Sequence, residues 1–193
     1  MRRNPTIILI ATFIGLAGLG WLALSGPPPI RIPSIAKAVA DAQPGLYKVT
    51  YVDDGDTIVV QMPTGKETVR FIGADTPEVK DPRKPVQCYG EIASAHTKAL
   101  LGHGESVRLA PDPDDTDRDK YGRLLRYVYL TDGTLLNAEL IRDGYAFAYV
   151  VFPFTKKEDF RALETAAHTA NRGLWAACNV NSSTIIKQTA GTK

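Results

Sequence analysis

The chain has 193 residues, of which 44% are hydrophobic and 23% charged, the balance of a globular protein. This composition excludes collagen-like, coiled-coil and extensively disordered chains, and the length suffices for one domain with an added tail or anchor. The formal net charge is +2, but residues 1–25 carry Arg2 and Arg3 and no acid, so the remainder is neutral. A neutral body argues against charge-driven coating of nucleic acid, although a local cationic site can still act on a phosphodiester.

Residues 6–25 form an uncharged apolar run behind the basic pair Arg2 and Arg3. As a helix rising ~1.5 Å per residue, the run spans the ~30 Å hydrocarbon core of a bilayer. We therefore predict an N-terminal hydrophobic helix in residues 1–25 that anchors the chain in a membrane, with the rest outside the cytoplasm by the positive-inside rule. Secretion after cleavage of a signal peptide is the alternative, because Ala23-Leu24-Ser25 matches a small-residue cleavage site.

Residues 26–45 are rich in proline and predict a stiff linker. A folded domain is expected over residues 46–178, and residues 179–193 have little apolar content, which predicts a disordered tail. Alternating apolar side chains predict a strand from residue 47 to 51, followed by strands at 57–62 and 67–73 that are joined by a turn at 63–65. Three short antiparallel strands with tight turns favour a small barrel or sandwich.

In the second half of this domain, apolar stripes and helix-end signals predict three helices, at residues 89–101, 135–143 and 156–172. Thr155 is the expected N-cap of the last. Strands are expected at residues 106–110 and 122–130, and a strand-like run at 145–151. The acidic segment that contains Asp112 is expected to be a solvated loop.

The chain contains two cysteines, Cys88 and Cys178. They are either two separate buried thiols or one disulfide, and export would favour the disulfide because oxidising compartments preserve such bonds. The bond would close a loop of about 90 residues, for which the chain-entropy model gives at most ~4–5 kcal/mol of stabilisation.

Residues 70–78 carry an unusual density of charge around a turn. Arg70 lies on the third predicted strand, and Asp75 and Glu78 follow within a segment that contains Gly73 and a proline. The turn at residues 63–65 should bring Asp56, at the start of the second strand, close to the end of the third. Carboxylates brought together repel unless a cation lies between them or one is protonated. Oxygen ligands without His or Cys select Ca²⁺ or Mg²⁺, although an aspartate beside a glycine is also a common turn cap.

Arg123 precedes the predicted strand that ends near residue 130. Guanidinium groups match the oxygens of a phosphate, so Arg70 and Arg123 beside a hard cation would form a phosphoryl site. For either arginine taken alone, a surface ion pair is the ordinary explanation.

Several separated motifs resemble the staphylococcal-nuclease-like (thermonuclease) domain in order and approximate spacing. They are Asp-Gly-Asp-Thr at 54–57, Arg70 with Asp-Thr-Pro-Glu at 75–78, Tyr-Gly at 89–90, Thr-Asp-Arg-Asp-Lys-Tyr-Gly-Arg at 116–123 and Leu-Asn at 136–137. The resemblance covers about residues 46–176. It implies an α+β fold with a mainly β core, a five-stranded OB-fold barrel with three helices. It also implies Ca²⁺-dependent hydrolysis of DNA and RNA that leaves 3′-phosphate ends, and we expect a monomer.

The resemblance also implies roles for individual acidic residues. Asp56 and Asp75 would bind Ca²⁺ together with the backbone carbonyl of Thr76. Glu78 would position or deprotonate the attacking water, a contribution that is typically 10²–10⁴-fold for a general base.

The resemblance also implies that four basic or polar residues contact the substrate. Arg70 and Arg123 would hold the scissile phosphate and stabilise the transition state, while Lys120 and Tyr121 would contact a nucleotide phosphate. Residues 149–152 lack the second tyrosine of the stretch that can flank a base in the family. A non-hydrolytic OB-type module that binds nucleic acid or protein at the membrane is the alternative function, but none of the five central acids and arginines is replaced.

Overall fold

The computed structural model describes residues 45–81 and 85–180. The predicted N-terminal helix lies outside these residues, as does almost all of the linker and of the C-terminal tail. Within the two described ranges, no helix is both long and apolar enough to cross a bilayer.

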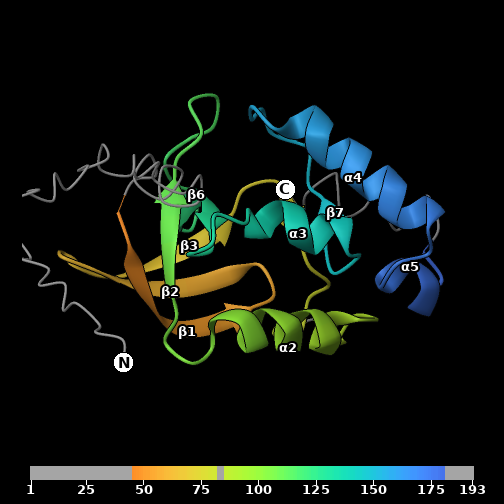
Figure 1. Ribbon diagram of the computed structural model, residues 1–193, viewed down its shortest axis with the longest axis horizontal. Coiled ribbons are helices and arrows are strands. Elements are labelled where there is room, and N and C mark those ends of the chain that lie inside the picture. Colours follow the sequence, from red (N-terminus) through yellow and green to blue (C-terminus); the bar gives the residue numbers. More distant parts are fainter. Residues whose placement is uncertain (1–44, 82–84, 181–193) are drawn as a thin grey trace, which may run out of the picture. The chain divides into compact units, whose positions relative to one another are not determined.

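Five strands close into a barrel in the order β1-β2-β3-β6-β5 (Figure 1). β3 and β6 run parallel, whereas the other neighbouring pairs of the barrel are antiparallel. This mixed, OB-like barrel confirms the predicted five-stranded architecture. The strands are β1 (Tyr47–Asp54), β2 (Thr57–Met62), β3 (Gly65–Phe71), β5 (Ser106–Ala110) and β6 (Leu124–Tyr129).

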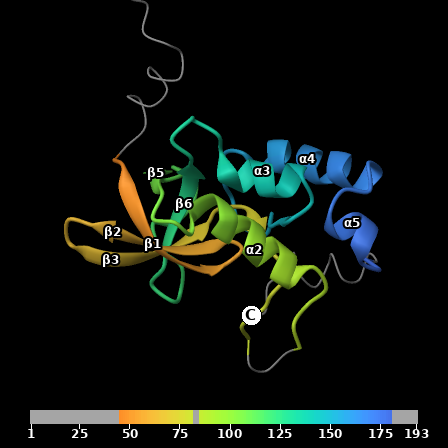
Figure 2. The same ribbon diagram turned by 60° about the horizontal axis from the view of Figure 1, so that its bottom comes forward.

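Three helices of seven or more residues accompany the barrel within the described ranges, as predicted: α2 (Gly90–Leu101), α3 (Leu136–Arg142) and α4 (Lys157–Thr169). A fourth, α5 (Leu174–Ala177), is a single turn that was not predicted. α2 lies along β1, and α3 packs against β6 on one side and α4 on the other (Figures 1 and 2).

The core fills the barrel and continues between the barrel and α3 and α4. Inward-facing residues of the strands are almost fully buried because side chains alternate between the two faces of a strand. Leu140 of α3 and Phe160 of α4 extend the same cluster, so these helices cover the barrel with apolar faces. Its strand residues include Val49, Val52, Ile58, Val60, Val69, Phe71, Val107, Leu109 and Val128.

The prediction of a strand over residues 145–151 was wrong in extent. Only β7 (Phe147–Ala148) forms, and it pairs with β4 (Ala74–Asp75) in a separate two-stranded sheet. A strand needs a neighbour to satisfy its backbone, and the pairing with β4 ends at the Tyr149 N–H, which donates to the Gly73 carbonyl at 2.9 Å. β4 directly follows β3, so this small sheet fixes the turn that carries the charged segment.

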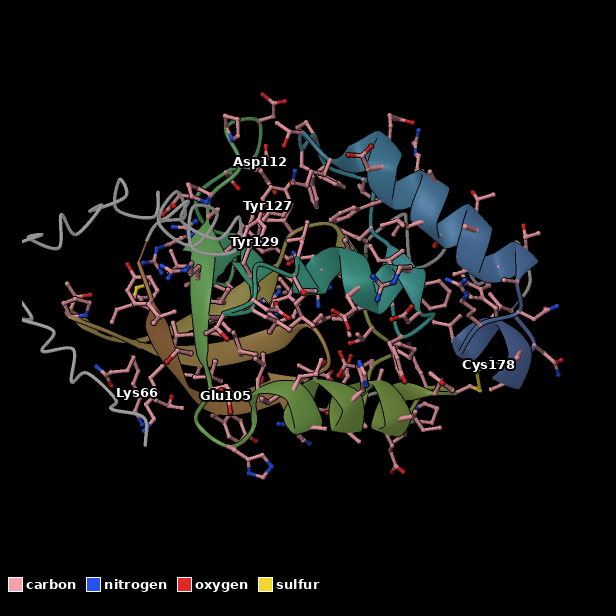
Figure 3. The ribbon with its side chains drawn as sticks, viewed as in Figure 1. Lys66, Glu105, Asp112, Tyr127, Tyr129 and Cys178 are labelled. Atoms are coloured by element: carbon pink, nitrogen blue, oxygen red, sulfur yellow. A yellow bond between two sulfur atoms is a disulfide. The ribbon has the colours of Figure 1, made fainter. Side chains whose placement is uncertain are left out.

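Asp112 was expected in a solvated loop, and this was also wrong. Its side chain is only 5% exposed. One carboxylate oxygen accepts the Tyr127 hydroxyl at 2.6 Å, the Thr155 backbone N–H at 2.8 Å and the Thr155 hydroxyl (Figure 3 labels Asp112 and Tyr127). Thr155 is therefore bound to Asp112 and is not the N-cap of α4, which is Lys156.

These hydrogen bonds decide the ionisation of Asp112. Burial alone would raise its pKa, but the bonds from Thr155 and Tyr127 outweigh burial, and the pKa is lowered. Burial and the hydrogen bond to Asp112 raise the pKa of Tyr127. The ionised carboxylate thus ties β6 to the segment that leads into α4.

We expect Asp112→Ala to lower the free energy of unfolding by about 2–3 kcal/mol at pH 7, because it leaves buried donors unpaired. Because the folded-state pKa is lowered, the stabilisation is fully present above the ordinary aspartate pKa of about 4. It is lost as the pH falls through the lowered folded-state value. Urea denaturation at pH 7 and at pH 3 measures both effects.

The matched control is Asp114→Ala, which removes an exposed acid of the same loop. It should change stability by less than about 0.5 kcal/mol. Equal denaturation midpoints for the two variants would contradict the role of Asp112.

The Sγ atoms of Cys88 and Cys178 are bonded, and the two Cα atoms lie 6.0 Å apart. The bond joins the segment that enters α2 to the residue that follows α5 (Figure 3 labels Cys178). The two cysteines are 90 residues apart in the sequence, so the bond closes most of the described chain into one loop.

Replacing both cysteines by serine should lower the free energy of unfolding by about 3–4 kcal/mol, since a loop of this length gains much freedom when unfolded. Urea denaturation of the oxidised protein, the reduced protein and the double variant measures this. The reduced protein should resemble the variant, and a midpoint equal to that of the oxidised protein would show that the bond contributes nothing.

Candidate active site

The hairpin of β2 and β3 brings the first acid and the first arginine together. Thr57 lies opposite Arg70 in the strand register, and the Phe71 N–H donates to the Asp56 carbonyl at 3.0 Å. The expected proximity of Asp56 to the end of the third strand is therefore present.

Arg70 lies between two carboxylates. Its guanidinium forms ion pairs with Oδ1 of Asp56 and with Oδ1 of Asp75. Asp56 is buried, and the side chains of Arg70 and Asp75 are partly buried. The second oxygen of Asp56 accepts the Thr76 N–H at 2.7 Å, so the β4 turn is bound directly to the start of β2. Burial raises the pKa of Asp75, and Arg70 opposes that rise.

Thr76 packs tightly against Gly55. A Cβ atom at Gly55 would lie 2.7 Å from Oγ1 of Thr76, which is too close for any side chain. The Thr76 hydroxyl is buried and has no hydrogen-bond partner in the described part of the chain. The Gly55 carbonyl accepts the Thr97 hydroxyl at 2.7 Å, which fastens this turn to α2.

Glu78 lies in the same group of acids. Its Oε1 accepts the N–H groups of Val79 at 3.1 Å and of Lys80 at 2.8 Å. Burial, together with the charge of Glu78 beside it, raises the pKa of Asp54 to about 6, against the opposing N–H of Gly55. The sequence prediction assigned no role to Asp54, although the Asp-Gly-Asp motif contains it.

Arg123 immediately precedes β6, where Leu124 lies opposite Val69 of the parallel strand β3. Its Nε donates to Oδ2 of Asp119 at 2.6 Å. The other oxygen of Asp119 accepts the N–H groups of Tyr121 and Arg123, so this aspartate shapes the whole turn. The charge of Arg123 opposes the rise in the pKa of Asp75, which places Arg123 within electrostatic reach of the acids. Sequence reasoning missed Asp119.

Lys120 and Tyr121 lie on the outer side of that turn. The Tyr121 side chain is 72% exposed. The Lys120 ammonium lies 5.2 Å and the Arg123 guanidinium 5.4 Å from the centre of its ring. In the described part of the chain, Lys120 and Tyr121 make no contact with Asp56, Asp75 or Glu78. The two residues instead form a cationic and aromatic surface beside Arg123.

A pair of aromatic rings follows β7, where the Tyr149 N–H donates to the Gly73 carbonyl at 2.9 Å, next to β4. The ring centres of Tyr149 and Phe152 are 5.9 Å apart, and Phe152 is 55% exposed. Burial raises the pKa of Tyr149, and the nearby charge of Asp75 adds to the rise. Tyr149 and Phe152 thus form an aromatic pair in the stretch that lacks the second tyrosine of the family.

The sequence of the chain matches the family model "Staphylococcal nuclease homologue" over residues 68–177, more than half of its length. It is 34% identical to the thermonuclease of Staphylococcus hyicus over 91% of this chain and 99% of that protein. Identity to the thermonuclease of Staphylococcus intermedius is 38% over 77% of this chain and 82% of that protein.

A third relative is Endonuclease YncB of Bacillus subtilis, which is 46% identical over 64% of this chain. The match spans 58% of that protein, less than two thirds of its length. The family model and the near-complete match to a thermonuclease agree with the motifs around Arg70 and Arg123. The chain therefore belongs to the staphylococcal nuclease family of thermonuclease-like enzymes, as its sequence motifs predicted.

Proposed function

We propose that this protein is a Ca²⁺-dependent nuclease that hydrolyses phosphodiester bonds of DNA and RNA. The observation that carries the proposal is the group of Asp56, Asp75 and Arg70, with Glu78 beside it and Arg123 within electrostatic reach. These residues supply acids for a hard cation and two guanidinium groups for a phosphate. A thermonuclease relative that matches along almost its whole length supports the same activity.

The donors at this site fit a calcium ion. Asp56 and Asp75 already lie on either side of one positive charge, and the buried hydroxyl of Thr76, the residue after Asp75, lacks a partner among the described residues. Within the described residues, no group of three or more His, Cys, Asp or Glu side chains is arranged to hold a metal. Calcium also accepts backbone carbonyls and water as ligands, so two aspartates with the Thr76 carbonyl suit it. The ion would supply charge stabilisation at the phosphoryl oxygens.

The arginines and Glu78 divide the remaining work. Arg70 becomes available to a phosphate once Asp56 and Asp75 are otherwise neutralised, and Arg123 approaches from β6. Both would stabilise the negative charge on the non-bridging phosphoryl oxygens as water attacks in line. Glu78 would take the proton of the water. The new phosphorus–oxygen bond forms as the bond to the 5′-oxygen breaks, and that oxygen leaves as an alkoxide that takes up a proton from water to become a hydroxyl.

The surfaces on either side of the acid group would hold the rest of the substrate. Lys120 and Tyr121 offer a charge and a hydroxyl to a neighbouring phosphate. Tyr149 and Phe152 offer faces on which a base can stack, which is worth about 1–3 kcal/mol per base in other proteins. Such contacts tolerate many sequences and suit a nuclease that acts on both DNA and RNA.

We place this activity outside the cytoplasm. The disulfide supports export, because such bonds persist in oxidising compartments. The uncharged residues 6–25 would anchor a monomer in the membrane, or would be removed to release it. The mass of the mature N-terminus distinguishes the two.

The full chain should cleave DNA and RNA in the presence of Ca²⁺ and lose this activity with a calcium chelator, because both carboxylates then lack their cation. Release of acid-soluble nucleotides from each substrate measures it. Equal rates with and without the chelator would remove the metal from the proposal. A folded protein that binds nucleic acid without cleaving it would favour the non-hydrolytic binding module.

Glu78→Gln should lower kcat by about 10²–10³-fold while leaving nucleotide affinity unchanged, because the amide cannot accept the proton of the water. The matched control is Glu91→Gln, which changes an exposed acid in the first turn of α2 and should keep the wild-type rate. An undiminished rate for Glu78→Gln would remove this residue from the mechanism.

A further inference from the structure

Gln87 holds the backbone of Glu78 by two hydrogen bonds. The Glu78 N–H donates to the Gln87 side-chain oxygen Oε1 at 2.9 Å. In the other direction, the Gln87 N–H donates to the Glu78 carbonyl at 2.9 Å. The backbone N–H and the backbone carbonyl of Glu78 are therefore both bound to one residue, nine positions later in the chain.

The start of α2 fixes Gln87 against the same peptide. The Gly90 N–H donates to the Gln87 carbonyl at 3.0 Å, which closes a turn just before the helix. A Cβ atom at Gly90 would lie 2.9 Å from the Pro77 carbonyl oxygen and 3.2 Å from that of Glu78. The absence of a side chain at Gly90 thus lets the helix begin directly on the Pro77–Glu78 backbone.

The disulfide fixes the position of Gln87 from the other side. Cys88 follows Gln87 directly and is bonded to Cys178 at the end of α5. Trp175 of α5 packs edge-on against Phe147 of β7, with ring centres 5.3 Å apart. Cys88, the neighbour of Gln87, is therefore linked covalently to a residue that packs on a second apolar cluster, formed by Phe147, Ala167, Leu174 and Trp175.

The beginning of the same segment is held on β1. The Lys80 ammonium donates to Oδ1 of Asp53 at 2.7 Å and to the Tyr51 hydroxyl at 2.9 Å. Those groups are largely exposed, so the contact is worth little in stability. Gln87 differs because it binds the peptide of Glu78 itself.

We infer that Gln87 is a positioning residue for Glu78, and that the Cys88–Cys178 disulfide holds Gln87 in place. This inference rests on the proposed role of Glu78 as the base. A general base must be held to a fraction of an ångström, and a displacement of about 1 Å can cost 10²-fold in rate. Gln87 lies in a partly exposed loop, so its side chain has little part in the core.

The test compares two replacements of Gln87 in the full-length protein, with Ca²⁺ and single-stranded DNA as substrate. Gln87→Met keeps the length of the side chain and removes the acceptor, and kcat should fall about tenfold or more while KM changes less than twofold. Gln87→Glu keeps an acceptor oxygen and should retain at least a third of the wild-type kcat. The Tm of both variants should remain within a few degrees of the wild type.

The matched control is Gln61→Met, an exposed glutamine near the opposite end of β2 from Asp56. It should leave kcat unchanged. A wild-type kcat for Gln87→Met, or an equal loss in Gln87→Glu, would overturn the positioning role. A wild-type protein that cleaves nothing would overturn the nuclease proposal and this inference together, whereas an active wild type with an unaffected Gln87→Met overturns only the inference.

The contribution of the disulfide is tested by a double-mutant cycle. Cys88→Ser/Cys178→Ser should lower kcat at temperatures where the variant stays folded. Adding Gln87→Met to this double variant should then lower kcat by a clearly smaller factor than in the oxidised protein, because both changes release the backbone of Glu78. Fully additive losses would separate the disulfide from the positioning of Glu78.

Discussion

The ion pairs of Arg70 with Asp56 and Asp75 are the interaction on which the site depends. The buried carboxylate of Asp56 and the partly buried one of Asp75 would repel each other without Arg70, and burial already raises the pKa of Asp75. The guanidinium balances them because the β2–β3 register places Arg70 beside the start of β2. The close contact of Gly55 with Thr76 keeps the two aspartates near one another. Asp56 and Asp75 therefore need a positive charge between them, and their oxygen ligands favour a hard cation.

The position of the turn that carries the site depends on the buried side-chain amide of Asn137. Its side-chain N–H group donates to the Ile72 carbonyl at 2.9 Å, and its oxygen accepts the Val128 N–H at 2.8 Å. One residue of α3 thus ties the end of β3 to β6. Asp112 ties the outer end of β6 to the segment before α4 in a similar way. Buried polar residues connect the barrel to its helices, while apolar contacts supply most of the stability.

The barrel could be predicted because alternation along its strands is a local signal. The pairing of β4 with β7 could not, since strands of two residues carry no pattern and form only where tertiary contacts bring them together. Asp56, Arg70 and Asp75 were predicted from the turn at residues 63–65, whose hairpin sets which strand ends meet. Gln87 and Asp119 were missed because the sequence of a polar loop does not reveal which backbone N–H groups its side chains accept in the fold. The burial of Asp112 depends on Thr155, 43 positions away, which local sequence cannot reveal.

The parallel pairing of β3 with β6 has a consequence for how the protein becomes active. Antiparallel hairpins pair near neighbours in the sequence, but β3 and β6 are joined by a crossover of roughly fifty residues, and such long-range pairs form slowly. Arg70 and Arg123 lie on opposite sides of that pairing. The two arginines of the proposed site are therefore brought together only when the barrel closes.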